Sequence, residues 1–159
     1  MTNLPHILNW RRYNDRITTS GQPSEDELAE IHRTGVRHII NLGPHHNDGA
    51  LPDERKTVTD LGIEYIYIPV EFGTPKDADF EQFTAALDRL GDIKIHEHCI
   101  YNARVSAFFY RYAKSGGNIP VDLAFSIMDG TWRPGDDFAD FIGDPNAKGK
   151  PNTYLGYEY

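Results

Sequence analysis

The stretch IKIHEHCIYNARVSAFFYRYAK, residues 93–114, predicts a buried strand that leads through a short loop into a helix. Its first six residues, Ile93 to His98, alternate between apolar and polar side chains, as a short strand does. Residues Arg104 to Lys114 are rich in aromatic and small side chains that suit a helix. Cys99 lies at the junction, where the unpaired N–H groups that begin a helix can face an anion.

The remaining sequence alternates between predicted helices and strands. A capping box at Ser24 begins one helix, Asp79 is a suitable N-cap for another, and Gly35, Gly62 and Gly91 follow three predicted helices. The predicted helices are 25–33, 52–61, 79–90, 104–114, 120–128 and 136–142, and the predicted strands are 36–42, 63–70 and 93–98. This order predicts an α/β layer fold, with one domain over residues 1–142 and an irregular tail over residues 143–159.

Composition and charge limit the classes of function. The 159 residues are 39% hydrophobic and 25% charged, which is typical of a soluble globular domain. The net charge of −8 argues against general binding to nucleic acids or to anionic membranes. Met1 to Trp10 lacks the basic start and apolar run of a secretory signal, so we expect a cytoplasmic protein.

Cys99 is the single cysteine of the chain, which excludes an intramolecular disulfide and a dithiol redox cycle. A cysteine attacks as the thiolate, which is favoured at a helix N-terminus beside a cation. Arg104 supplies such a cation, and its planar fork can bind two oxygens of a phosphate while the backbone N–H groups of the loop bind the others. The junction therefore predicts an anion-binding loop with a nucleophile.

Several further motifs accompany this loop. The motifs are His98-Cys99 with Arg104 and Ser106, Thr19-Ser20-Gly21-Gln22-Pro23, Ile68-Pro69-Val70 and Trp132-Arg133-Pro134. Together they resemble the bacterial dual-specificity and tyrosine phosphatases, in particular the beta-lactamase-hydrolase-like phosphatase group, over about residues 9–142. The resemblance implies a central, mainly parallel sheet flanked by helices. It also implies a phosphatase that forms a thiophosphoryl-enzyme intermediate on Cys99 and uses no cofactor or metal.

The loop departs from that family in its length. The family usually has five residues between the cysteine and the arginine, and this chain has four. Either the helix begins early and Arg104 stays on the anion, or the helix is unchanged and Arg104 turns aside by about 100°. The mid-loop glycine is also absent, although Asn102 tolerates a left-handed backbone better than most residues.

Three functions remain open at this point. The first arrangement of Arg104 predicts a phosphatase, and the second predicts an inactive anion-binding pseudophosphatase. A spacing of four residues is also that of rhodanese-like sulfurtransferases, which carry a persulfide on the cysteine.

The resemblance assigns further roles by position. It implies that Ser106 hydrogen-bonds the departing thiolate. From their places in the sequence, we expect the backbone N–H groups of Ile100, Tyr101, Asn102 and Ala103 to bind the substrate. We expect His98, just before Cys99, to order the loop or tune Cys99. Since His96 and His98 are two residues apart, they share one strand face, with Glu97 opposite. His45 and His46 could join Cys99 in a metal site, but their spacing is unlike that of zinc motifs, and we predict no metal.

The family's general acid is an aspartate after the strand that precedes the 79–90 helix, and no aspartate occupies that place here. Glu71 directly follows Ile68-Pro69-Val70 and is our predicted acid, with Asp77 and Asp79 as alternatives nearer the helix.

The loop contains no Lys or Arg between Cys99 and Arg104, which disfavours polyphosphorylated inositol lipids. We expect a phosphorylated partner of another kind, namely phosphotyrosine or a small phosphomonoester, with Tyr101 stacking on an aromatic leaving group. The sequence does not indicate an oligomeric state.

Overall fold

A five-stranded sheet forms the centre of the molecule in a computed structural model, which describes residues 2–155, 157 and 158. The strand order is β1-β2-β5-β3-β4; β1 pairs with β2 antiparallel, and every other pairing is parallel. The strands are β1 (Arg11–Arg12), β2 (Ile17–Ser20), β3 (His38–Asn41), β4 (Glu64–Tyr67) and β5 (Ile95–His98). The predicted mainly parallel sheet is confirmed.

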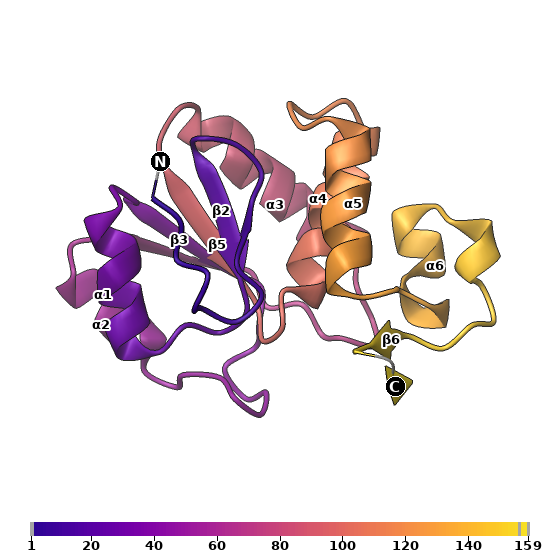
Figure 1. The fold of residues 1–159 in the computed structure, drawn as a ribbon, viewed down its shortest axis with the longest axis horizontal. Helices are drawn as coiled ribbons and strands as arrows, with labels where there is room; N and C mark the ends of the chain where they lie inside the picture. Colours follow the sequence, from indigo (N-terminus) through magenta and orange to yellow (C-terminus); the bar gives the residue numbers. More distant parts are fainter. Residues whose placement is uncertain (1, 156, 159) are drawn as a thin grey trace.

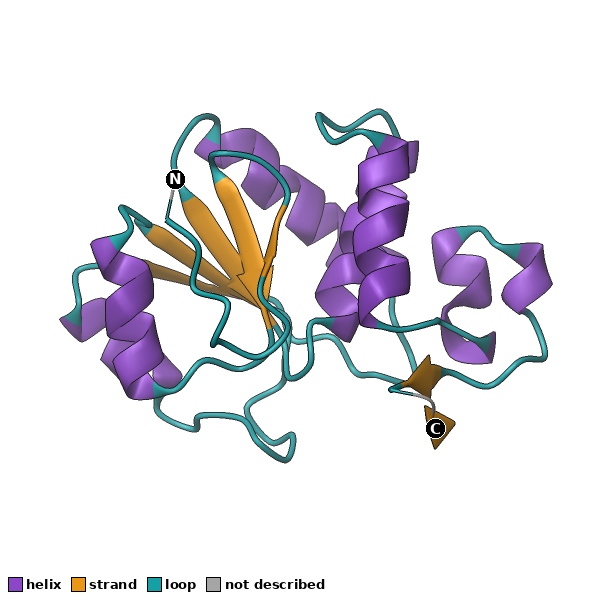
Figure 2. Cartoon of the chain, in the orientation of Figure 1, coloured by secondary structure: helices purple, strands orange, loops and turns teal. Residues whose placement is uncertain are grey.

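Helices cover both faces of the sheet, as Figures 1 and 2 show. Two of them, α1 (Glu25–Arg33) and α2 (Glu54–Asp60), lie on one side. The other side carries α3 (Asp77–Leu90), α4 (Ala103–Lys114) and α5 (Val121–Thr131), and α6 (Asp136–Ile142) lies beyond them. Among the described residues, no helix combines the length and the apolar character that crossing a bilayer requires.

The alternation of side chains along each strand divides the core between the two faces. On β3, Ile39 packs with Leu28 and Ile31 of α1, whereas Ile40 packs with the aromatic side chains of α3 and α4. Both isoleucines are fully buried. The sheet is therefore covered on both faces, which fixes the position of the loops at its ends.

The predicted elements agree with the structure apart from their ends. The capping box at Ser24 is present, with α1 at the predicted residues. The long helix begins at Asp77 rather than after Asp79, because Lys76 is its N-cap and the Asp79 carboxylate accepts a hydrogen bond from the Lys76 N–H. Strands β1 and β2 were not predicted, since Ile17–Ser20 is a short, mostly polar run that is nevertheless entirely buried.

The segment 143–159, predicted to be irregular, has structure in its described part. It contains the 3₁₀ helix η1 (Pro145–Ala147) and an antiparallel pair, β6 (Thr153–Tyr154) and β7 (Tyr157–Glu158). Thr153 also bridges Arg133, and Gly135 lies so close to the Lys150 carbonyl that an ideal Cβ would overlap it. Close backbone packing thus holds this segment against the turn before α6.

Candidate active site

A cavity of about 330 Å³ opens at the carboxyl ends of the parallel strands, where β5 passes into α4. Such ends are where α/β sheets usually bind ligands. The cavity is lined by Asn47, Asp48, Phe72, Cys99, Ile100, Tyr101, Ala103 and Arg104. Of the residues predicted from the sequence, it brings together Cys99, Arg104 and three residues of the loop between them.

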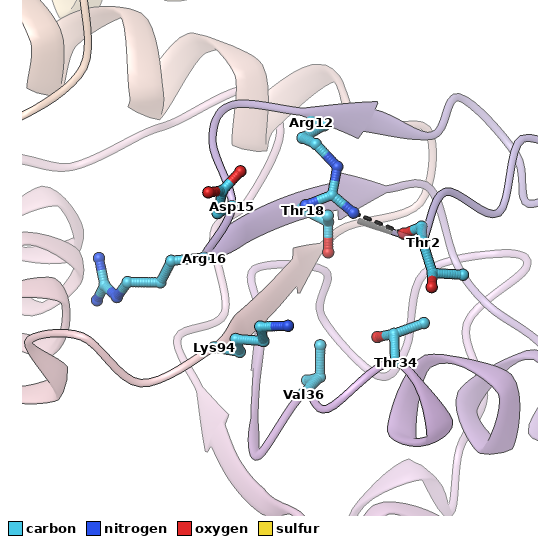
Figure 3. A pocket seen from close by; sticks show the side chains of 8 residues that line it. All are labelled: Thr2, Arg12, Asp15, Arg16, Thr18, Thr34, Val36 and Lys94. Atoms are coloured by element: carbon cyan, nitrogen blue, oxygen red, sulfur yellow. Dashed lines mark hydrogen bonds between the residues drawn. The ribbon is translucent and has the colours of Figure 1, made fainter.

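A second hollow lies at the opposite, amino ends of the strands (Figure 3). It is lined in part by Arg12, Arg16 and Lys94, and the Arg12 guanidinium donates a hydrogen bond to the carbonyl of Thr2. Its volume is about 20 Å³, which is the scale of one water molecule. It is too small for a phosphate ester, and the cavity at Cys99 is the candidate active site because it brings the predicted nucleophile and cation together.

The loop after β5 turns at Asn102, whose φ is 68°. This is the left-handed conformation that the sequence predicts Asn102 can tolerate. Its Nδ2 donates to the carbonyl of Asn9 and to the Thr19 hydroxyl, at 2.9 Å each. Asn102 therefore lies behind the loop and anchors it, while Ile100, Tyr101 and Ala103 face the cavity.

A second anchor comes from the Gly21-Gln22 turn. The N–H of Gln22 donates to the Ile100 carbonyl at 3.0 Å. An ideal Cβ at Gly21 would lie 2.6 Å from that same oxygen, so only glycine fits there. The Ser-Gly-Gln-Pro motif therefore shapes, through its backbone, the predicted anion-binding loop of residues 99–104 (the anion loop).

Arg104 lies in the first turn of α4, which begins at Ala103. Its Nη1 donates to the Asn47 Oδ1 at 2.9 Å and to the Val70 carbonyl at 2.8 Å, and its guanidinium lies 5.6 Å from the centre of the Phe72 ring. The side chain is buried but lines the cavity together with Cys99. The helix thus begins one residue before its predicted start, and Arg104 lines the same cavity as Cys99.

His98, on the strand immediately before Cys99, makes a buried ion pair. Its Nε2 lies 2.7 Å from the Glu54 Oε2, and its Nδ1 lies 3.0 Å from the Cys99 carbonyl oxygen. Both partners accept hydrogen bonds, so both ring nitrogens carry a proton and the ring is an imidazolium. The His98–Glu54 ion pair therefore lies directly behind the loop that follows Cys99.

Burial alone would raise the pKa of Glu54, but the charge and hydrogen bond of His98 outweigh it and hold that pKa below its ordinary value. Hydrogen bonds from Gln22 and Tyr65 act in the same direction. Glu54 is thus an ionised, fully buried carboxylate. Glu54 could not be identified from the sequence, because nothing in the polar sequence around it indicates that this glutamate is buried.

His96 lies on the same face of β5 as His98, as predicted, and stacks on Trp10. Its Nε2 donates to the Ser20 hydroxyl, which itself donates to the Gly21 carbonyl, and its Nδ1 accepts from the Thr18 hydroxyl. Burial, reinforced by the charge of His98, holds the pKa of His96 well below its ordinary value. His96 is therefore a neutral ring that joins β2 to β5.

Ser106 is fully buried one turn into α4. Its hydroxyl donates to the Ala103 carbonyl at 2.9 Å and accepts from the Trp132 indole N–H at 3.1 Å. It is not among the described residues that line the cavity. In this structure the Ser106 hydroxyl joins the anion loop to the Trp132-Arg133-Pro134 motif.

The three predicted candidates for the general acid lie apart from the described lining of the cavity. Glu71 pairs with His46, at 3.2 Å between Oε1 and Nε2, and Asp77 pairs with Arg111. Asp79 accepts from the Lys76 N–H. The carboxylate that does line the cavity belongs to Asp48, in an Asn-Asp-Gly sequence that reads as an ordinary turn.

Sequence comparison finds curated relatives for part of the chain. A beta-lactamase hydrolase-like protein from Xylella fastidiosa is 33% identical over 90 residues, which are 52% of this chain and 20% of that protein. The chain thus matches about a fifth of the length of this curated relative. No family model matches the chain.

Two solved structures are informative. TpbA from P. aeruginosa, solved in complex with pTyr, is 20% identical with a TM-score of 0.61, covering 93% of this chain and 86% of that one, and it shows the fold. A DUF442 phosphatase-like protein from Shewanella putrefaciens is 31% identical with a TM-score of 0.79, and covers 92% of this chain and 97% of that one. An identity of this size over nearly the whole of both chains shows that the protein belongs to the DUF442 family of phosphatase-like proteins, which has the cysteine-phosphatase fold.

Proposed function

We propose that the protein is a cysteine-dependent phosphomonoester phosphatase with Cys99 as its nucleophile. The observation that carries the proposal is that Cys99 and Arg104 line one cavity at the start of α4. The buried His98–Glu54 pair lies behind the loop and holds its backbone at the Cys99 carbonyl. A net charge of −8 gives no general attraction for phosphate, so binding depends on these local groups.

In the proposed reaction the Cys99 thiolate attacks phosphorus in line, and the ester oxygen leaves with a proton. Arg104 and the backbone N–H groups of the loop stabilise the charge on the equatorial oxygens. Water then hydrolyses the thiophosphoryl intermediate, which releases phosphate and restores the thiolate.

Aromatic side chains support a phosphotyrosine or another small phosphomonoester as the substrate. Tyr101 is half exposed beside the cavity, and Phe72 lines it from a different loop. Flat rings of this kind favour an aromatic leaving group. Arg104 is the one cation among the described lining residues, so highly phosphorylated substrates lack partners here.

Hydrolysis of 4-nitrophenyl phosphate tests the proposal. We expect turnover by the wild type, none by Cys99→Ser, and a loss of about 10²–10³-fold in kcat/KM for Arg104→Lys, which keeps the charge but not the fork. Arg89→Lys on the exposed side of α3 is the matched control and should retain wild-type activity.

Two outcomes would overturn the proposal. If wild type and Cys99→Ser are equally inactive while both still bind vanadate, the protein is an anion-binding pseudophosphatase. If the wild type instead transfers sulfur from thiosulfate to cyanide, with Cys99 required, it is a sulfurtransferase.

A further inference from the structure

We propose that Asp48, in the loop between β3 and α2, is the general acid and general base of this active site. The inference rests on the proposed phosphatase reaction and assigns its proton donor to a residue that the sequence did not suggest. The predicted acid, Glu71, is the competing assignment.

The first argument is position. The leaving oxygen of a phosphate ester must lie above Cys99, on the side of the phosphorus opposite the attacking sulfur. A proton donor must therefore come from the wall of this cavity. Among the described residues that line it, Asp48 is the one with a carboxyl group.

The second argument is that the loop carrying Asp48 is fixed against the anion loop. An ideal Cβ on Gly43 would lie 3.3 Å from the Cys99 Cα, and one on Gly49 would lie 3.5 Å from the Ile100 Cγ2. Between these two points, the Asn47 Oδ1 accepts a hydrogen bond from Arg104. Asp48 thus lies between a residue bonded to the phosphate-binding arginine and a residue packed on the loop.

The same loop is anchored on its outer side. The His45 N–H donates to the Tyr67 hydroxyl at 2.9 Å, and the His45 ring stacks on the Tyr67 ring with 4.0 Å between centres. The Asn41 Oδ1 accepts from the Gly43 N–H at 2.7 Å. Catalytic groups need such support, because a misplacement of about 1 Å costs roughly 10²-fold in rate.

The third argument is that the competing carboxylates have other partners. Glu71 faces His46, Asp77 faces Arg111, and Asp79 caps α3, as described above. Asp48 is exposed to solvent, so the water that hydrolyses the intermediate can reach its carboxylate.

A single carboxyl group that donates a proton in the first step and accepts one in the second balances the protons of the reaction. In the first step the S–P bond forms and the P–O ester bond breaks, while the Asp48 carboxyl passes its proton to the leaving oxygen. In the second step the Asp48 carboxylate takes a proton from water as the new O–P bond forms and the S–P bond breaks. The thiolate and the protonated carboxyl are thereby restored, and phosphate leaves.

Two substrates with different leaving groups test the assignment. 4-Nitrophenolate is a stable anion that leaves without help, whereas phenolate needs a proton as it leaves. We use kcat/KM, because it reports the leaving-group step and not the hydrolysis step that both substrates share. We expect Asp48→Asn to lower kcat/KM for phenyl phosphate by about 10²–10³-fold, within the range of general acid catalysis. The loss of kcat/KM for 4-nitrophenyl phosphate should be at least tenfold smaller.

The matched control is Asp53→Asn, which makes the same change of charge in an exposed residue that does not line the cavity. It should leave both substrates unaffected. Equal losses of kcat/KM on both substrates in Asp48→Asn, or no loss, would overturn the assignment. A selective loss of phenyl phosphate turnover in Glu71→Gln would give the role to Glu71. Inactivity of the wild type on both substrates would instead overturn the proposed function.

Discussion

The Nε2 of His98 lies 2.7 Å from the Oε2 of Glu54, and neither side chain has any exposed surface. Burying two opposite charges removes their hydration, which is costly. Their mutual attraction offsets this cost only if their remaining polar atoms also form hydrogen bonds. The Cys99 carbonyl accepts from the second nitrogen of His98, and Gln22 donates to the second oxygen of Glu54. The pair therefore joins α2, β5 and the Gly21-Gln22 turn behind the anion loop.

Removing the charge of Glu54 leaves that of His98 buried without compensation. We expect Glu54→Gln to lower the free energy of unfolding by about 3–5 kcal/mol at pH 7, measured by urea denaturation. The pKa of Glu54 is lowered in the folded protein, so its contribution is complete above the ordinary value of 4.5 and is lost as pH falls through the folded pKa. The difference between variant and wild type should therefore shrink below pH 4.5.

The exposed neighbour Asp53 provides the control for this measurement. Asp53→Asn makes no change to the buried pair, and we expect it to stay within about 0.5 kcal/mol of wild type. A loss below 1 kcal/mol in Glu54→Gln at pH 7 would show that the pair is not the ionised arrangement described here.

Glu97, on the opposite face of β5, is fully buried, and both of its carboxyl oxygens lack a hydrogen-bond partner. Burial raises its pKa well above the ordinary value of 4.5, more than the positive charge of Arg16 lowers it. The folded state then keeps a proton that the unfolded chain releases, so stability falls as pH rises from 4.5 towards the raised pKa.

Glu97→Met replaces this carboxyl with an apolar side chain of similar length. We expect the variant to be more stable than wild type, by an amount that grows by about 1.4 kcal/mol per pH unit between pH 5 and 7. Urea unfolding at several pH values measures the difference in free energy of unfolding between variant and wild type. Glu81→Met, on the exposed side of α3, is the control. A constant difference across this range would contradict a protonated Glu97.

Asn102 combines a left-handed backbone with two hydrogen bonds that anchor the anion loop. Asn102→Gly removes the hydrogen bonds alone, whereas Asn102→Ala also forces an alanine into the left-handed region. We expect the alanine variant to be less stable than the glycine variant by about 1 kcal/mol, with the lower kcat/KM of the two. Equal stabilities would mean that the loop changes conformation once its anchor is lost.

Local patterns in the sequence determined much of the fold. Capping at Ser24, the apolar runs of β3 and β4, and the strand–Cys99–helix junction predict the α/β order, because each depends on neighbours a few residues apart. The face shared by His96 and His98 followed from the two-residue period of a strand. The left-handed backbone at Asn102 could likewise be predicted, since tolerance of that conformation is a property of the residue itself.

Tertiary structure alone decided the partners of these residues. The placement of Arg104 beside Cys99 depends on Asn47 and Val70, which are 57 and 34 residues away along the chain. The burial of Glu54 against His98 and the presence of Asp48 in the cavity wall depend on how the β3–α2 segment packs on the sheet. The sequence determined which chemistry is available at Cys99, because that chemistry belongs to residues close together in the chain. Which carboxylates face His98 and the cavity depends on packing between distant segments, and no local pattern encodes it.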